Sequence, residues 1–115
     1  MQLNHLHLRV RDVAVARRFY SEYFDMREHA QHGDVLFMTD DARCDLALAP
    51  AEQVEALPAW FHFGFRLDDP DRVRALYARM STAGVTIVCE LEDEPAQVSF
   101  RCADPDGYTI EIYWE

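Results

Sequence analysis

The chain has 115 residues, a length typical of one compact domain, and half of them are apolar, which excludes a disordered protein. Its formal net charge of −10 argues against a nucleic-acid partner, because such a partner requires a basic surface. All eleven basic residues are arginines, so chemistry that depends on a lysine amine is excluded.

Three cysteines, Cys44, Cys89 and Cys102, are too widely spaced to indicate a zinc knuckle or a disulfide scaffold. No apolar run reaches the about 18 residues that a membrane-spanning helix needs. The first residues lack the apolar core of a signal peptide, because Arg9 and Arg11 interrupt it. We therefore expect a cytoplasmic protein that has no membrane partner.

The first predicted element is a strand over LNHLHLRV, residues 3–10, in which apolar and polar residues alternate strictly. Because successive side chains of a strand point to opposite faces, His5, His7 and Arg9 share one face and the leucines and valine share the other. Two of the five histidines of the chain thus lie side by side on one strand face.

A helix is predicted next, over residues 13–24, with Asp12 as its N-terminal cap and apolar residues at helical spacing. Three extended runs follow, separated by turns at Gly33 and at the Asp40–Asp41 pair. These runs cover residues 26–32, 34–38 and 44–49.

The second half repeats this order after a connector over residues 50–59, which has a proline near each end. A strand and a helix lie between residues 60 and 83, and Gly84 ends the helix. Three strands are predicted over residues 86–92, 97–102 and 108–114. The sequence ADPDGY supplies the turn between the last two.

The two halves are related as an internal repeat. A shift of 57 residues aligns HLHLRVRDVAVARRFY with HFGFRLDDPDRVRALY without a gap, and five of sixteen positions are identical. The identical pairs are His5 and His62, Arg9 and Arg66, Asp12 and Asp69, Arg17 and Arg74, and Tyr20 and Tyr77. We therefore predict an α+β fold, a single domain over residues 1–115, in which two β-α-β-β-β modules (1–49 and 60–115) form a cupped mixed sheet.

The repeat places His62 on the strand face equivalent to that of His5. In the last strand, Glu111 lies between two isoleucines, so it points away from the apolar face. Two histidines and one carboxylate are a common ligand set for a catalytic metal, because three protein ligands leave positions open for a substrate. Each residue also has an ordinary alternative, since strand histidines often serve packing and Glu111 could simply face solvent.

Three motifs resemble the vicinal oxygen chelate family, which includes glyoxalase I, extradiol dioxygenases, fosfomycin-resistance enzymes and bleomycin-sequestering proteins. They are LNHLHLRVRDVAVARRFYSEYFDM, FHFGFRLDD and DPDGYTIEIYW, in the family's order and over essentially the whole chain. The resemblance implies a divalent metal held by His5, His62 and Glu111, with Mn²⁺ or Fe²⁺ favoured over Zn²⁺ or Ni²⁺. It also implies chelation of a small substrate through neighbouring oxygens.

The chain departs from individual members of this family. The position of a second glutamate in glyoxalase I corresponds here to Ala47, with Asp45 two residues away on the same face. Fosfomycin enzymes carry a threonine at the position of His7 and a tyrosine at the position of Arg101. The resemblance is closest to the fosfomycin-resistance-like and dioxygenase-like members, and the reaction stays open between ring-cleaving dioxygenation and addition or isomerisation.

His7 is the candidate catalytic residue, because a neutral imidazole beside a metal-bound substrate can accept a proton. Alternatively, it orients other groups or lines the pocket. The candidate substrate-binding residues are Arg9, Arg66, Arg101 and Tyr113.

The predicted function is thus a metal-dependent enzyme of the glyoxalase or dioxygenase type. Two alternatives stay open. The first is a metal-free protein that sequesters a cationic ligand, which the acidic charge and the aromatic residues would suit. Those aromatic residues are Trp60, Phe61, Phe63, Tyr113 and Trp114. The second is an interaction domain in which the metal-ligating residues are retained but no longer serve a function.

We also expect a homodimer, because open strand edges favour pairing between chains.

Overall fold

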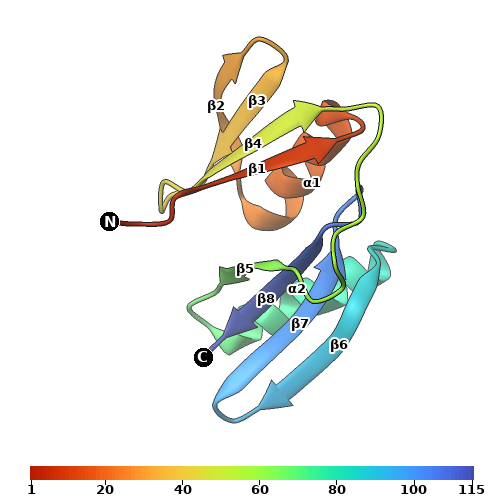
Figure 1. Cartoon of the computed structure of the whole chain (residues 1–115). Coiled ribbons are helices and arrows are strands. Elements are labelled where there is room, and N and C mark those ends of the chain that lie inside the picture. The colour runs from red at the N-terminus through yellow and green to blue at the C-terminus, as the bar shows by residue number, and fades with distance from the viewer. The chain divides into compact units, whose positions relative to one another are not determined.

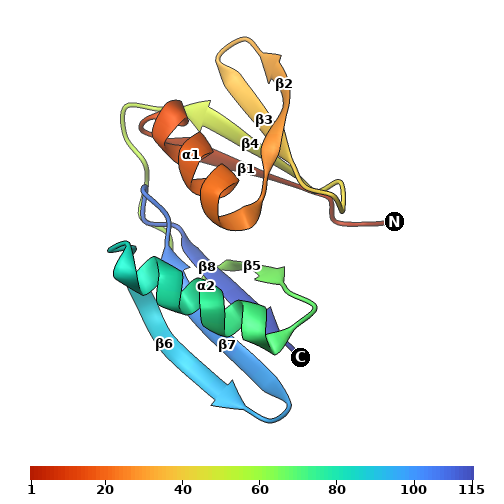
Figure 2. The same cartoon turned by 180° about the vertical axis from the view of Figure 1, so that it is seen from behind.

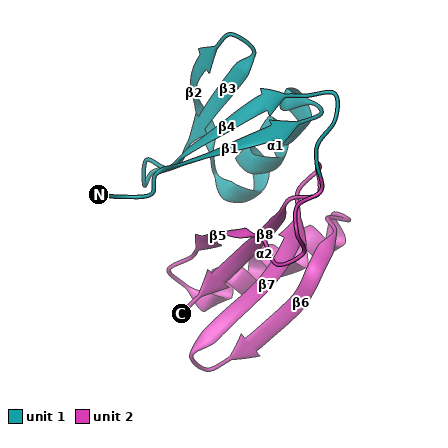
Figure 3. Cartoon of the chain, in the orientation of Figure 1, with its two compact units in different colours: residues 1–55 teal, residues 56–115 magenta.

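The computed structural model describes residues 1–115, which form two compact units, residues 1–55 and 56–115 (Figure 3). Each unit has one helix and four strands in the order β-α-β-β-β, so the predicted α+β fold with two such modules is confirmed. The division falls within the predicted connector 50–59. Neither helix has the length and hydropathy that a membrane span requires.

Unit 1 is a four-stranded mixed sheet with its helix against one face (Figures 1 and 2). The strands follow the order β1-β4-β3-β2, in which β1 and β4 are parallel and the other neighbours are antiparallel. The elements are β1 (His5–Val10), α1 (Val13–Phe24), β2 (Arg27–His32), β3 (Val35–Thr39) and β4 (Asp45–Pro50).

Unit 2 repeats this arrangement, with the strand order β5-β8-β7-β6 and a parallel pair formed by β5 and β8. Helix α2 lies across one face of this sheet (Figure 2). The elements are β5 (Phe63–Arg66), α2 (Pro70–Thr82), β6 (Ile87–Glu94), β7 (Gln97–Ala103) and β8 (Thr109–Trp114). His62, which the sequence predicted within the first strand of this unit, immediately precedes β5.

The core of each unit consists of apolar side chains from its helix and from the helix-facing side of its sheet. In unit 1 the buried residues include Leu8, Val10, Ala16, Phe19, Tyr20, Leu36, Met38, Leu46 and Leu48. In unit 2 they include Val73, Met80, Val98, Phe100, Cys102, Ile110 and Ile112. The predicted alternation of β1 is confirmed, because His5, His7 and Arg9 are exposed while Leu8 and Val10 are buried. The other sheet face of each unit therefore carries the candidate site residues.

Each helix begins at an aspartate cap, and the cap predicted at Asp12 is present. Asp12 accepts hydrogen bonds from the backbone N–H groups of Ala14 and Val15, at 2.9 and 3.3 Å. Asp69 accepts one from the N–H of Asp71 at 2.8 Å. These bonds satisfy donors that have no partner within the first turn of a helix, which typically stabilises a helix by about 1 kcal/mol. The repeated aspartate thus has a structural role.

The arginines that the repeat aligns within the two helices, Arg17 and Arg74, also have a structural role, because each forms an ion pair with the outermost strand of its sheet. Arg17 of α1 forms an ion pair with Glu28 of β2 at 3.1 Å. Arg74 of α2 donates two hydrogen bonds to the carboxylate of Asp93 in β6, at 2.7 and 2.8 Å. The hydrogen bond from Arg74 lowers the pKa of Asp93.

The outermost strands β2 and β6 are irregular. The pairing of β2 with β3 shifts between Glu28 and Ala30, and that of β6 with β7 shifts on both sides of Cys89. Most residues of both strands are exposed. The repeated tyrosine of α2 also contacts β6, because the hydroxyl of Tyr77 donates a hydrogen bond to Glu90.

The three free cysteines differ in environment, and this predicts their reactivity. Cys102 is fully buried, and burial raises the pKa of its thiol to about 12, with a further contribution from the charge of Asp104. Burial, followed by the charges of Asp40 and Asp45, also raises the pKa of Cys44. Cys89 is exposed. Because the thiolate is the reactive form and a raised pKa keeps the thiol protonated, we expect Cys89 to react first with Ellman's reagent at pH 8.

The expected time course is one fast thiol per folded chain, a slower reaction at Cys44, and reaction of Cys102 only after unfolding. A Cys89→Ser variant is the control, because it should lack the fast phase. A fast phase that persists in this variant would contradict the assignment.

Candidate functional site

The open face of the unit 2 sheet carries Glu111, Arg101 and Gly64 in one row across three strands. Gly64 of β5 pairs with Glu111 of β8, which in turn pairs with Arg101 of β7. The neighbours of Glu111 in sequence, Ile110 and Ile112, are buried on the opposite face. The alternation of β8 therefore places the carboxylate of Glu111 on the face away from α2, as the sequence predicted.

His62, Glu111 and Arg101 form a contiguous polar group within unit 2. The Nε2 atom of His62 lies 3.6 Å from Oε2 of Glu111, and Nη2 of Arg101 lies 3.8 Å from Oε1 of the same carboxylate. The three side chains are between 25% and 33% exposed, so they are accessible to a small molecule but partly shielded from water. Each carboxylate oxygen of Glu111 thus faces a different nitrogen group.

The ring of His62 is oriented by the backbone. Its Nδ1 atom lies 3.1 Å from the carbonyl oxygen of Trp60, which can only accept a hydrogen bond. This contact favours the tautomer in which Nδ1 carries the proton and donates it to the carbonyl. Nε2 then has a free lone pair, and this is the atom that faces Glu111. A histidine that binds a metal through one ring nitrogen usually donates a hydrogen bond from its other ring nitrogen to an oxygen acceptor.

His5 has the same type of contact in unit 1. Its Nδ1 atom lies 3.2 Å from the side-chain oxygen Oδ1 of Asn4, which leaves Nε2 as its free ring nitrogen in the matching tautomer. The sequence pattern did not identify Asn4 or the Trp60 carbonyl. The asparagine directly before His5 is the one signal that could have indicated the first of these contacts.

The neighbours of β1 on the open face of unit 1 follow from its parallel pairing with β4. His5 pairs with Asp45, His7 with Ala47, and Arg9 with Ala49. Asp45 is therefore the lateral neighbour of His5, and Ala47 is the lateral neighbour of His7. In the register of the parallel strands, the pair of His7 and Ala47 in unit 1 corresponds to the pair of Gly64 and Glu111 in unit 2.

Arg9 and Arg66 occupy equivalent strand positions in the repeat, and each contacts the last residue of its own unit. Arg9 forms an ion pair with Glu55 at 3.1 Å, and Arg66 donates a hydrogen bond to the backbone carbonyl of Glu115 at 2.7 Å. Tyr113 lies beside Arg66 in the sheet register and is partly exposed. Arg9 and Arg66 therefore each have a partner within their own unit.

The structure brings His62, Glu111 and Arg101 together in unit 2, and places His5, His7 and Arg9 along β1 in unit 1. Within either unit, no group of three or more His, Cys, Asp or Glu side chains is arranged to hold a metal ion. Of the three expected ligands, His5 belongs to unit 1, and His62 and Glu111 belong to unit 2.

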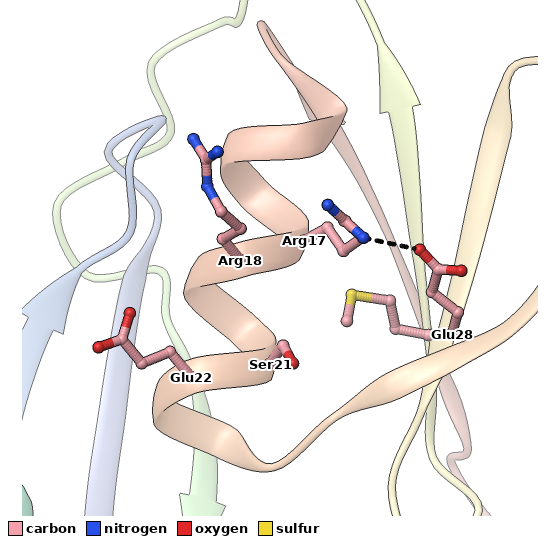
Figure 4. Close-up of a pocket in the computed structure, with 6 residues that line it drawn as sticks. Arg17, Arg18, Ser21, Glu22 and Glu28 are labelled. Atoms are coloured by element: carbon pink, nitrogen blue, oxygen red, sulfur yellow. Dashed lines mark hydrogen bonds and ion pairs between the residues drawn. The ribbon is translucent and has the colours of Figure 1, made fainter.

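A separate pocket of about 370 Å³ lies in unit 1 between α1 and the strands β2 and β3 (Figure 4). Its lining residues are Arg17, Arg18, Ser21, Glu22, Glu28 and Met38. The ion pair between Arg17 and Glu28 borders it. Met38 belongs to the helix-facing side of the sheet, so the pocket lies on the face opposite to His5 and His7, and none of the predicted site residues lines it.

The family follows from a comparison of the sequence with family models. The model of the Glyoxalase/Bleomycin resistance protein/Dioxygenase superfamily matches residues 2–112. The chain belongs to this superfamily. The resemblance to vicinal oxygen chelate proteins is thereby confirmed, and this superfamily includes lyases and dioxygenases and commonly uses divalent metals. No curated protein sequence matches the chain.

Solved structures of the glyoxalase superfamily are similar over nearly the full length. A possible glyoxalase from Bacillus cereus is 30% identical, with 97% of both chains covered and a TM-score of 0.84. The lactoylglutathione lyase from Agrobacterium tumefaciens is 21% identical over 98% of this chain and 92% of the other, with a TM-score of 0.75. The fosfomycin resistance protein FosX from Listeria monocytogenes is 17% identical over 100% and 93%, with a TM-score of 0.85. The last two likenesses concern the fold alone.

Proposed function

We propose that this glyoxalase-superfamily protein is a metal-dependent enzyme acting on a small substrate that chelates the metal through oxygens. The ligands are His5, His62 and Glu111. The observation that carries this proposal is the pair of Nε2 of His62 and Oε2 of Glu111, which face each other at 3.6 Å on the open sheet face of unit 2. His62 is held there by its contact with the Trp60 carbonyl.

The chemistry of this pair fits a divalent metal. A separation of 3.6 Å is longer than a hydrogen bond between nitrogen and oxygen, so the pair is not held by a direct bond. Two ligands of one metal, each at about 2.0–2.2 Å, lie about 3–3.5 Å from each other, which is close to the observed separation. An imidazole nitrogen and a carboxylate oxygen therefore stand at nearly the spacing that a shared metal requires.

His5 supplies the third ligand through its free Nε2 atom, either from the same chain or from a second copy. A site with two histidines and one carboxylate leaves coordination positions open and is typical of non-haem Fe²⁺ enzymes. We therefore favour Fe²⁺ or Mn²⁺ over Zn²⁺ or Ni²⁺. When bound, the metal supplies Lewis-acid polarisation of the substrate oxygens.

The surrounding side chains provide orientation and proton transfer. The positive charge of Arg101 lies 3.8 Å from Oε1 of Glu111, whereas Oε2 is the carboxylate oxygen that faces His62. The guanidinium of Arg101 has five donors and can hold Glu111 while other donors face an anionic substrate group. Arg66, Arg9 and Tyr113 are further candidates for substrate contact. His7 is the candidate residue for accepting or returning a substrate proton.

One observation favours the metal-free alternative, a protein that sequesters an apolar or cationic ligand. Trp60 is 74% exposed and packs edge-on against Phe61, directly before His62. An exposed tryptophan can stack on such a ligand without any metal. The orientation of His62 and Glu111 has no purpose in this alternative, so we rank it second.

The experiment that separates these functions is metal analysis of protein purified without a histidine tag. The protein is stripped with a chelator, reconstituted separately with Mn²⁺, Fe²⁺, Zn²⁺ or Ni²⁺, and desalted. Retention of about one ion per chain, with Mn²⁺ or Fe²⁺ supporting turnover in a screen of catechols, α-hydroxyketones and epoxides, supports the enzyme. Retention of none of the four metals would exclude it and leave the sequestering function.

We also propose a homodimer. Every unit has open edge strands, which expose unpaired backbone donors and acceptors. Light scattering at micromolar concentration should give a mass near twice the 13.4 kDa of one chain. A mass of 13.4 kDa at all concentrations tested would contradict the homodimer.

A further inference from the structure

The pocket of unit 1 between α1 and the strands β2 and β3 has the size and the accessible walls of a small-molecule site. Its volume of about 370 Å³ falls in the roughly 300–1,000 Å³ range that is typical of such sites. Met38, which is fully buried, closes the pocket on the side of the core. The side chains of Arg17 and Glu28 are 43% and 58% exposed, so a ligand can reach both charged groups.

The charges that line this pocket are balanced, although the chain as a whole has a net charge of −10. Two of the six lining residues are arginines, Arg17 and Arg18, and two are glutamates, Glu22 and Glu28. A ligand with a single charge would lie beside groups of the same sign as well as the opposite one, and like charges in contact oppose binding. A ligand that carries one charge of each sign can pair with both. The lining therefore favours a small zwitterion over an anion or a cation.

The internal repeat shows that the arginine of this pocket has unused donors. Its counterpart in α2, Arg74, donates from all three guanidinium nitrogens, with Nε and Nη2 bound to Asp93 and Nη1 bound to Asp71. Arg17 donates only from Nη1, to Oε1 of Glu28 at 3.1 Å. A guanidinium has five N–H donors in total. Arg17 therefore keeps donors for an anionic group, which Arg74 does not.

A serine hydroxyl lies beside these unused donors. Ser21 follows Arg17 by four residues, so both lie on the same side of α1. Figure 4 shows these two residues on the side of the helix toward Glu28, and Arg18 and Glu22 on the opposite side. The residue of α2 that the offset of 57 residues aligns with Ser21 is Ala78, which has no hydrogen-bonding group on its side chain. The combination of unused guanidinium donors with a hydroxyl is thus specific to unit 1.

We propose that this pocket binds a small zwitterion of the α-amino-acid class. The carboxylate of the ligand accepts hydrogen bonds from the unused donors of Arg17 and from the hydroxyl of Ser21. The ammonium donates to Oε2 of Glu28, since Oε1 already accepts from Arg17. An apolar side chain of the ligand lies over Met38. The pocket is on the helix-facing side of the sheet, opposite to His5 and His7, so this ligand is distinct from the substrate of the proposed enzyme and requires no metal.

Titration calorimetry with L-leucine, with a chelator present, tests the binding. The analogues are L-leucic acid, in which a hydroxyl replaces the ammonium, and L-leucinol, in which a hydroxymethyl group replaces the carboxylate. We expect L-leucine to bind with a dissociation constant on the order of 1 mM, and each analogue to bind about tenfold or more weakly because it loses a charge-assisted contact. Equal binding of the three compounds, or no saturation by L-leucine up to about 20 mM, would overturn the proposal.

Two variants assign the charged groups of the ligand to their partners. In Glu28→Gln, the loss of the ammonium should cost at most about threefold, while the loss of the carboxylate still costs about tenfold. In Arg17→Gln the two costs should be reversed. The matched control is Arg27→Gln, because Arg27 is also ion-paired, to Asp41 at 2.9 Å, but does not line the pocket. All three variants should fold, since an exposed ion pair contributes little to stability, and unchanged preferences in Glu28→Gln and Arg17→Gln would overturn the assignment.

The position of the ligand is measured by amide chemical shifts in the wild-type protein. Shifts on addition of L-leucine should be concentrated in α1, β2 and β3 and be absent from β1 and β8. Shifts concentrated at Glu111 and its neighbours in β8 would instead place the amino acid on the open sheet face of unit 2 and overturn the proposed pocket site. Because the chelator keeps the protein free of metal, either result is independent of whether the proposed enzyme function is correct.

Discussion

Replacing His62 by alanine is expected to reduce the metal content of the reconstituted protein from about one divalent ion per chain to a small fraction of that value. His62 is the ligand whose orientation is best defined, because its Nδ1 contacts the Trp60 carbonyl and its Nε2 faces Glu111. The affinity should fall by more than the roughly 10–100-fold that the loss of an outer-sphere partner costs. Elemental analysis and chelator competition measure both quantities.

The matched control is His29→Ala, which removes an exposed histidine of the outer strand β2 and should leave the metal content unchanged. Arg101→Gln should give an intermediate result, about 10–100-fold weaker binding, since it removes only the charge that orients Glu111. If His62→Ala retains as much metal as the wild type, the ligand assignment is wrong.

Replacing His7 by glutamine is expected to slow turnover about a hundredfold or more while leaving the metal in place. His7 lies two residues from His5 on the same face of β1, which separates the two side chains by about 7 Å along the strand. That distance is too long for both to reach one metal at about 2.1 Å from an undistorted strand. Glutamine keeps a polar side chain of similar size but cannot act as a base near neutral pH.

The His7→Gln variant is compared with His5→Gln, which should lose affinity for the metal because His5 is a proposed ligand. Steady-state kinetics and metal titration are therefore measured on both variants. If both lose metal alike, His7 is a ligand. If His7→Gln retains both metal and turnover, His7 only lines the face of the sheet.

Much of the fold could be predicted because its determinants are local or repeated. The alternation in LNHLHLRV predicted which residues of β1 are exposed, and the aspartate at position 12 predicted where α1 begins. The offset of 57 residues predicted that both halves share one topology, because identical patterns of period 2 and 3.6 build identical elements.

The contacts between strands could not be predicted in the same way, because register depends on residues far apart in the chain. The sequence placed Glu111 on an open face but did not identify Arg101 as its neighbour in β7. It assigned Arg101 to the substrate alone. It also could not separate the repeated residues by role, whereas the structure shows that Asp12, Arg17 and their counterparts have structural partners.

The irregular outer strands have a consequence for colloidal stability. Strand β6 carries Glu90, Glu92, Asp93 and Glu94 along its free edge, and its bulges interrupt the regular ladder that a second chain would need. At neutral pH, like charges on two such edges repel and oppose fibrous stacking. Near the isoelectric point of about 4.8 the net charge vanishes, so the charge repulsion that opposes precipitation is weakest in mildly acidic solution.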